Sequence, residues 1–141
     1  MGQARPALGG VTRKAIGSTA TEWIKTERLR DGRGPLVIAP AVDGLNLISW
    51  TKDNRDFVES KLLRYGALLF RGFGSLEPGE LERFIEALSG DLLEYRERSS
   101  PRHQVEGRIY SSTDYPAHQG IFFHNENSYQ HVWPMKICFL C

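Results

Sequence analysis

A histidine and a glutamate two positions apart, His124 and Glu126, are the residues whose types and spacing most clearly predict chemistry. They follow the aromatic and β-branched run Ile121–Phe123, whose composition favours a strand. Side chains alternate between the two faces of a strand, so this spacing predicts that the imidazole and the carboxylate project from the same side. Two histidines and one carboxylate on one face of a metal form the facial triad of non-heme iron(II) oxygenases. His124 and Glu126 could supply two of these three ligands.

A third ligand is not evident from the spacing. The chain has three other histidines, which are His103, His118 and His131. His118 shares strand parity with His124, but Pro116 just before it and Gly120 after it argue against a continuous strand. His131 would face away on a continuous strand, so it could join the metal only if the chain turns after Glu126. His103 lies in an expected loop and has no predicted role.

Two polar residues near the predicted pair are candidate substrate contacts, Asp114 and Asn127. A carboxylate or amide beside the metal could bind the amine or carboxylate of an amino acid. The alternatives are a turn residue for Asp114 and a loop hydrogen bond for Asn127. Among the aromatic residues, Phe122 shares the ligand face and could wall a pocket, while Ile121 and Phe123 would pack on the other side.

Composition excludes several classes of protein. The 141 residues are 40% hydrophobic and 25% charged, which is ordinary for one soluble domain. A net charge of +1 gives no electrostatic reason to expect nucleic acid or a membrane surface as partner. The only cysteines, Cys138 and Cys141, lie in an apolar run and are expected to be buried and inert. So few cysteines fit a reducing compartment, which predicts a cytoplasmic protein.

The elements before the pair predict an α/β lead-in over the first part of a domain spanning 21–141, preceded by a tail over 1–20. A short helix is expected over Glu22–Leu29 and a longer one from Thr51 or Asp53 to a C-capping Gly66. The clearest helix begins at Pro78 and ends before Gly90, because apolar residues recur at helical spacing. Strands are expected at Leu36–Ile38 and, buried on both faces, at Ala67–Phe70.

Closely spaced strands are predicted after this lead-in, at 108–113, 120–129 and 135–141. The combination indicates an α+β protein whose second part is a sandwich or barrel. The last run, Met135–Cys141, is an apolar strand with no turn after it, and a domain seldom ends this way. We therefore expect either that the lead-in supplies partner strands or that the domain is incomplete, in which case the open strand could also pair with another chain.

Several motifs together resemble a known enzyme family. Gly66–Phe73 followed by an amphipathic helix resembles the N-terminal half of the taurine dioxygenase and clavaminate synthase superfamily. Ser99–Arg102, Tyr110–Pro116, His124–Tyr129 and Trp133–Pro134 resemble its syringomycin-biosynthesis-like branch. The similarity extends from about residue 13 to the last residue.

This resemblance implies an iron(II)- and 2-oxoglutarate-dependent oxygenase on a double-stranded β-helix, or jelly roll, of which the chain is the N-terminal portion. His124 and Glu126 match the first two iron ligands, with Glu where taurine dioxygenase has Asp. The distal histidine and the arginine that binds 2-oxoglutarate come later in the family, so no residue here matches them. The implied reaction is hydroxylation of an amino-acid-like or carrier-tethered substrate in secondary metabolism.

Two other interpretations stay open at this point. The chain could be a truncated and catalytically silent fragment of such an enzyme, because it has only two of the ligands. It could also be a cupin-like metal protein that uses His124, Glu126 and His131. The usual cupin order places two histidines before the carboxylate, and this sequence does not show that order.

Overall fold

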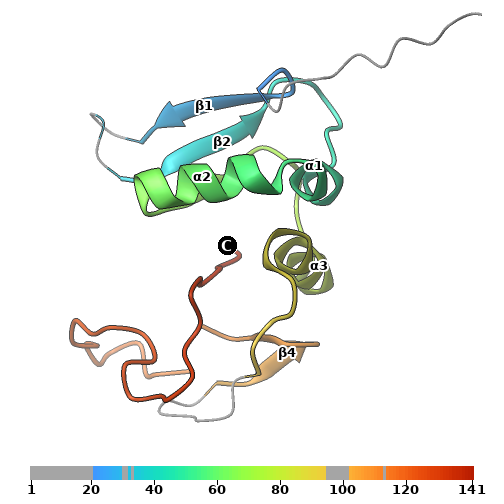
Figure 1. Cartoon of the computed structure of the whole chain (residues 1–141). Coiled ribbons are helices and arrows are strands. Elements are labelled where there is room, and N and C mark those ends of the chain that lie inside the picture. Colours follow the sequence, from blue (N-terminus) through green and yellow to red (C-terminus); the bar gives the residue numbers. More distant parts are fainter. Residues whose placement is uncertain (1–20, 30–31, 33, 95–101, 113) are drawn as a thin grey trace, which may run out of the picture.

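The structure is a computed structural model that describes residues 21–29, 32, 34–94, 102–112 and 114–141. The predicted tail over 1–20 lies outside the described residues. The described elements are five strands and three helices, arranged as a sheet with helices and a separate hairpin (Figure 1). The chain is therefore α+β, as predicted. None of its described helices has the length and apolar character needed to cross a membrane.

A three-stranded sheet in the order β1-β2-β3 forms the first layer. The central strand β2 (Leu36–Pro40) pairs in parallel with β3 (Leu68–Phe70), so both predicted strands are confirmed. Ile38 of β2 is completely buried. Strand β3 is only half-buried, contrary to prediction, because it is an edge strand with a partner on one side.

The predicted helix at Glu22–Leu29 is wrong, because this segment forms strand β1 (Ile24–Arg28). It pairs antiparallel with β2 from Ile24 opposite Pro40 to Arg28 opposite Leu36. The local helix propensity of this segment is weak, and the backbone hydrogen bonds offered by β2 override it. The charged side chains on β1 suit an edge strand, because they oppose pairing with another chain.

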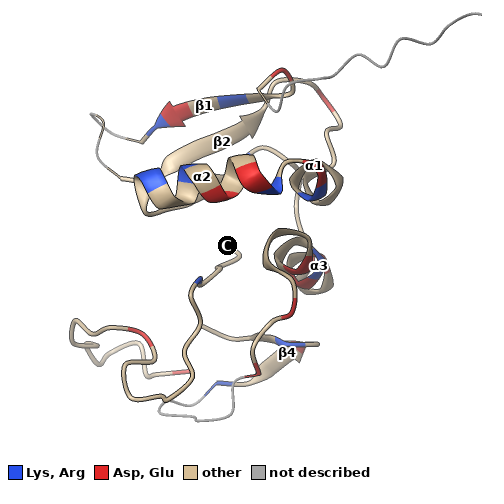
Figure 2. Ribbon diagram, viewed as in Figure 1, with Lys and Arg blue, Asp and Glu red and all other residues tan. Residues whose placement is uncertain are grey.

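Two consecutive helices connect β2 to β3, where one helix was predicted. They are α1 (Leu47–Asp53) and α2 (Arg55–Tyr65). The side chain of Asn46 caps α1 by accepting a hydrogen bond from the Ser49 amide at 2.9 Å. Gly66 ends α2 with a φ of 75°, as predicted, because a glycine adopts this left-handed conformation without strain. Figure 2 shows basic and acidic residues interspersed along α2.

Helix α3 (Pro78–Ser89) joins the sheet to the second half of the molecule. It begins at Pro78, as predicted, with a capping box between Glu77 and Glu80. Leu81, Phe84 and Leu88 are buried in the same core as β2, α1 and α2. The Phe84 ring packs edge-on against Phe70 of β3, with ring centroids 5.1 Å apart.

A two-stranded hairpin, β4 (Gln104–Glu106) with β5 (Ile109–Tyr110), lies against α3. Arg108 makes this attachment. Its guanidinium donates to Glu82 and Glu86 of α3, at 3.0 Å in each case, and to the Leu92 carbonyl oxygen at 2.9 Å. The predicted strand over 108–113 is thus reduced to β5, and position 113 lies outside the described residues.

The predicted strands at 120–129 and 135–141 are wrong, because residues 114–141 contain neither helix nor strand. A strand needs a hydrogen-bonded neighbour, and no described strand pairs with this segment. Phe122, Phe123 and Met135 are accordingly exposed, although Phe123 was expected to pack inside. The described residues form no double-stranded β-helix, and the segment instead runs back toward α2 and α3 (Figure 1).

We expect Phe84→Ala to lower the free energy of unfolding by about 3 kcal/mol or more, because it empties the contact between α3 and β3. Urea unfolding followed by circular dichroism measures this change. The matched control is Leu63→Ala on α2, whose side chain is 85% exposed and whose loss should cost less than about 0.5 kcal/mol. Equal losses in the two variants would contradict the assigned core.

Candidate metal centre

Glu126 is the first residue of a turn and belongs to no strand. Residues 126–129 are turn residues, and the Gln130 amide donates to the Asn127 carbonyl oxygen at 3.1 Å. Asn127 has a φ of 54°, a left-handed conformation that asparagine tolerates better than most residues. The chain therefore bends immediately after Glu126.

The protonation of the His124 ring follows from its contact with the backbone. Its Nδ1 lies 2.8 Å from the carbonyl oxygen of Phe122. A carbonyl oxygen can only accept, so Nδ1 must carry the proton and donate it. In the neutral imidazole, Nε2 then holds the free electron pair. A hydrogen bond of this kind orients histidines that bind metals in proteins.

The free ring nitrogen faces the predicted carboxylate. The distance from His124 Nε2 to Glu126 Oε2 is 3.6 Å, and the two side chains are 58% and 31% exposed. An imidazole nitrogen and a carboxylate oxygen are metal ligands of hard to intermediate chemical hardness, and such ligands suit a divalent iron ion. The structure thus brings together the two predicted ligands, although the segment that carries them forms no strand.

No third ligand joins this pair within the described part of the chain. There, no group of three or more His, Cys, Asp or Glu side chains is placed to hold a metal. His131 does not meet the other two, so the arrangement expected for a cupin-like site is not formed. The donors that the structure offers fit two positions of a metal ion.

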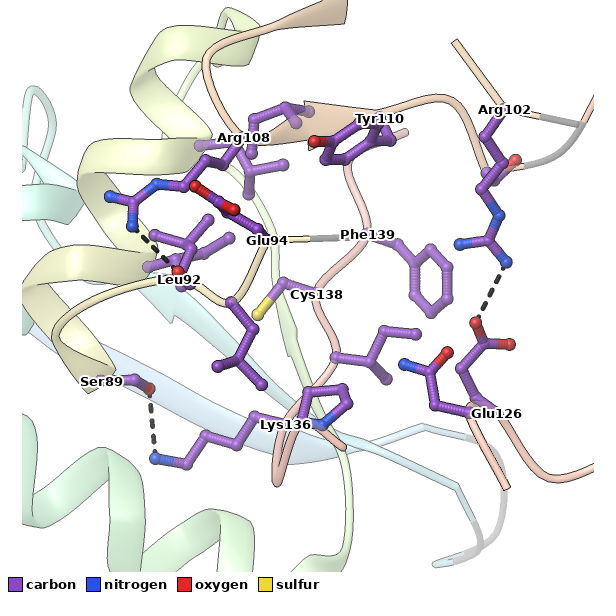
Figure 3. A pocket seen from close by; sticks show the side chains of 18 of the residues that line it. Ser89, Leu92, Glu94, Arg102, Arg108, Tyr110, Glu126, Lys136, Cys138 and Phe139 are labelled. Atoms are coloured by element: carbon purple, nitrogen blue, oxygen red, sulfur yellow. Dashed lines mark hydrogen bonds and ion pairs between the residues drawn. The ribbon is translucent and has the colours of Figure 1, made fainter. Parts of the chain in front are cut away.

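Arg102 is a partner of Glu126 that was not predicted from the sequence. Its Nη2 donates to Glu126 Oε1 at 3.0 Å, and their side chains are 20% and 31% exposed (Figure 3). The only signal in the sequence was the position of Arg102 in the Ser-Pro-Arg motif. Spacing could not reveal the contact, because 24 positions separate the two residues.

A cavity of about 1190 Å³ lies beside the pair, between α3, the hairpin and the C-terminal segment. Arg102, Glu126 and Asn127 line it, whereas His124 does not. Asn127 is only 8% exposed, and its Oδ1 is buried without a hydrogen-bond partner. A buried amide oxygen in this state is costly, so Asn127 is suited to accept a hydrogen bond from a bound group after a small movement.

Asp114, the other predicted substrate contact, is not among the residues that line this cavity. Its carboxylate lies 3.1 Å from Nδ1 of His103. This hydrogen bond is the main cause that lowers the pKa of Asp114, and Ser111 adds to it. His103, for which no role was predicted, therefore hydrogen-bonds the Asp114 carboxylate that was expected to contact a substrate.

The two cysteines differ from each other. Cys138 packs against the core and lines the cavity, and burial raises the pKa of its thiol, which fits an inert residue (Figure 3). Cys141 is exposed, contrary to prediction, because the final run is not a buried strand.

Replacing the partner of Asp114 should change its pKa. We expect His103→Ala to raise the pKa of Asp114 toward the ordinary value of about 3.9, because the ring hydrogen bond that favours the ionised carboxylate is lost. A lowered pKa stabilises the fold above the unfolded-state pKa, and this contribution is lost as pH falls through the folded-state value. Carboxyl carbon NMR across a pH series measures the shift.

The control is His118→Ala. This histidine lies in the same half of the chain, and its described contact is with Gln119 rather than Asp114. The Asp114 titration should not move in this variant. An unchanged titration in His103→Ala would show that the pairing does not hold in solution.

Comparison with known proteins identifies the family. Residues 28–141 match the family described as taurine catabolism dioxygenase TauD, TfdA. The dapdiamide synthesis protein DdaC of Enterobacter agglomerans is 40% identical over 82 residues, which cover 58% of this chain and 25% of that protein. A clavaminate synthase-like protein of Arabidopsis thaliana is 32% identical over 115 residues, covering 76% of this chain and 35% of that protein. The chain thus spans between a quarter and about a third of these relatives, and it belongs to the TauD, TfdA dioxygenase family.

Proposed function

We propose that this chain contributes to an iron(II)- and 2-oxoglutarate-dependent oxygenase. The observation that carries the proposal is the convergence of His124 Nε2 and Glu126 Oε2 in a member of a dioxygenase family. His124 Nδ1 donates its proton to the Phe122 carbonyl oxygen, so Nε2 of the neutral ring keeps a free electron pair. This is the form of histidine that binds a metal. When bound, iron and 2-oxoglutarate would supply the activation of oxygen for oxidation of a C–H bond.

The residues of this chain would bind and orient that metal. His124 offers Nε2 while Nδ1 remains bonded to the backbone, and Glu126 offers Oε2 while its other oxygen remains bonded to Arg102. We assign no catalytic residue beyond these two ligands. The third ligand and the arginine for 2-oxoglutarate are assigned to no described residue.

For the substrate, we propose an amino-acid-like or carrier-tethered molecule that is hydroxylated. This rests on the resemblance and on the relative that takes part in dapdiamide synthesis. Asn127, on the cavity wall beside Glu126, is the candidate contact for a substrate amine or amide. Asp114 is not carried over, because His103 holds its carboxylate outside the cavity lining.

A second candidate is that the 141 residues alone are catalytically silent. The described residues hold two ligands and no cluster of three, which favours this possibility. Equilibrium binding of iron(II) separates the two cases. Weak binding by the 141-residue chain favours silence, whereas tight stoichiometric binding would require a third ligand from this chain.

In a protein that contains this chain together with the rest of the family domain, iron(II), oxygen and 2-oxoglutarate should support formation of succinate. His124→Ala and Glu126→Ala should each reduce succinate to the level of a protein-free control, because each removes one of the three protein ligands of the facial triad. Succinate measured by mass spectrometry reports the outcome.

The matched control is His118→Ala, which leaves both ligands in place and should retain succinate formation. Circular dichroism of each variant establishes that the fold is preserved. Undiminished succinate formation in either ligand variant would rule out the assignment.

A further inference from the structure

The segment after Asp114 contains very little charge. Glu126 and Lys136 are the only acidic or basic residues in 115–141. Each has an opposite charge from an earlier part of the chain as its partner. Lys136 pairs with Glu59 of α2, and Glu126 pairs with Arg102. The segment has no helix or strand, so these side-chain contacts restrain its position in place of backbone hydrogen bonds.

Arg102 belongs to a better-anchored part of the molecule than Glu126 does. It lies two positions before β4 and is next to His103, whose amide donates to Ser111 Oγ at 3.0 Å. The Ser111 amide in turn donates to the His103 carbonyl oxygen at 2.9 Å. The hairpin is fastened to α3 through Arg108. The guanidinium of Arg102 therefore extends from a fixed hairpin to a loop.

The two oxygens of the Glu126 carboxylate have different neighbours. Oε1 accepts a hydrogen bond from Arg102 Nη2 at 3.0 Å, while Oε2 lies 3.6 Å from His124 Nε2. A charge-assisted bond from an arginine is short and directional, so it restricts rotation of the carboxylate about its own axis. One oxygen is held, and the other is turned toward the imidazole.

We propose that Arg102 is a positioning residue for the metal pair, which holds Glu126 Oε1 so that Oε2 and His124 Nε2 can bind the same ion. The inference rests on the proposed function. Groups that hydrogen-bond a metal ligand commonly contribute about 10- to 100-fold to metal affinity. The competing effect is repulsion, because the positive charge of Arg102 also opposes a cation. The two effects predict opposite signs when Arg102 is removed.

Titration of the labelled 141-residue chain with Mn(II) tests the inference in the absence of turnover. A bound Mn(II) broadens nearby NMR signals, and this method detects weak binding. The ring signals of His124 should broaden before those of His103, His118 and His131. We expect Arg102→Ala to raise the apparent dissociation constant by about tenfold. Arg102→Lys should recover part of this loss, because lysine retains the charge and a donor but not the planar fork.

Two further variants separate positioning from a general effect on the fold. Arg83→Ala removes an exposed arginine paired with Glu80 on α3, and it should leave Mn(II) binding unchanged. In a Glu126→Ala background, Arg102→Ala should have no further effect, because the arginine acts through that carboxylate. Amide chemical shifts of the hairpin report whether each variant is folded. If Arg102→Ala is unfolded, the comparison is made with Arg102→Lys instead.

The outcomes distinguish the inference from the function on which it rests. Selective broadening of His124 together with tenfold weaker binding in Arg102→Ala supports both. Selective broadening with unchanged or tighter binding in folded Arg102→Ala, or in Arg102→Lys when Arg102→Ala is unfolded, overturns the positioning role but leaves the metal pair. A loss that persists in the Glu126→Ala background also overturns it. Absence of selective broadening at His124 in the unchanged chain overturns the pair and the inference together.

Discussion

The carboxylate of Glu126 is the charge on which the arrangement of the C-terminal segment depends. It is the only acidic group in 115–141, and it is partly shielded from solvent between a guanidinium and an imidazole. The segment has no ladder of backbone hydrogen bonds to hold it. Its position is instead set by the Arg102 contact, the Lys136 contacts with Glu59 and Ser89, and the packing of Cys138 on the core.

Helix α3 connects the packed core to the hairpin and, through it, to the contact between Arg102 and Glu126. One side of the helix is buried with the sheet, where Phe84 meets Phe70 of β3. Its acidic residues Glu82 and Glu86 bind Arg108 and so fasten the hairpin. The hairpin in turn presents Arg102 to Glu126. Glu126 is thereby linked to a packed core although it lies outside it, and Figure 3 shows its contact with Arg102.

Part of the first half of the fold could be predicted from local signals. Helix α3 has regular apolar spacing and a proline at its start, and Gly66 marks the end of α2. Strand β1 could not be predicted, because its structure comes from pairing with β2 rather than from its own composition. Local patterns carry little information about such distant partners.

The two predicted ligands lie close together, but not on a strand, and their binding of a metal stays a prediction. Strand parity placed His124 and Glu126 on one side, and they do face each other, but their segment forms no strand and turns directly after Glu126. The role of Arg102 and the pairing of His103 with Asp114 depend on contacts between separate segments. Residue types and spacing alone could not establish these contacts.

Whether His124 and Glu126 bind iron together is the central claim, and equilibrium dialysis of iron(II) against a protein containing the whole family domain tests it most directly. The account predicts one iron per protein, with binding lost in both His124→Ala and Glu126→Ala variants that remain folded. Stoichiometric iron binding that survives both substitutions would contradict it.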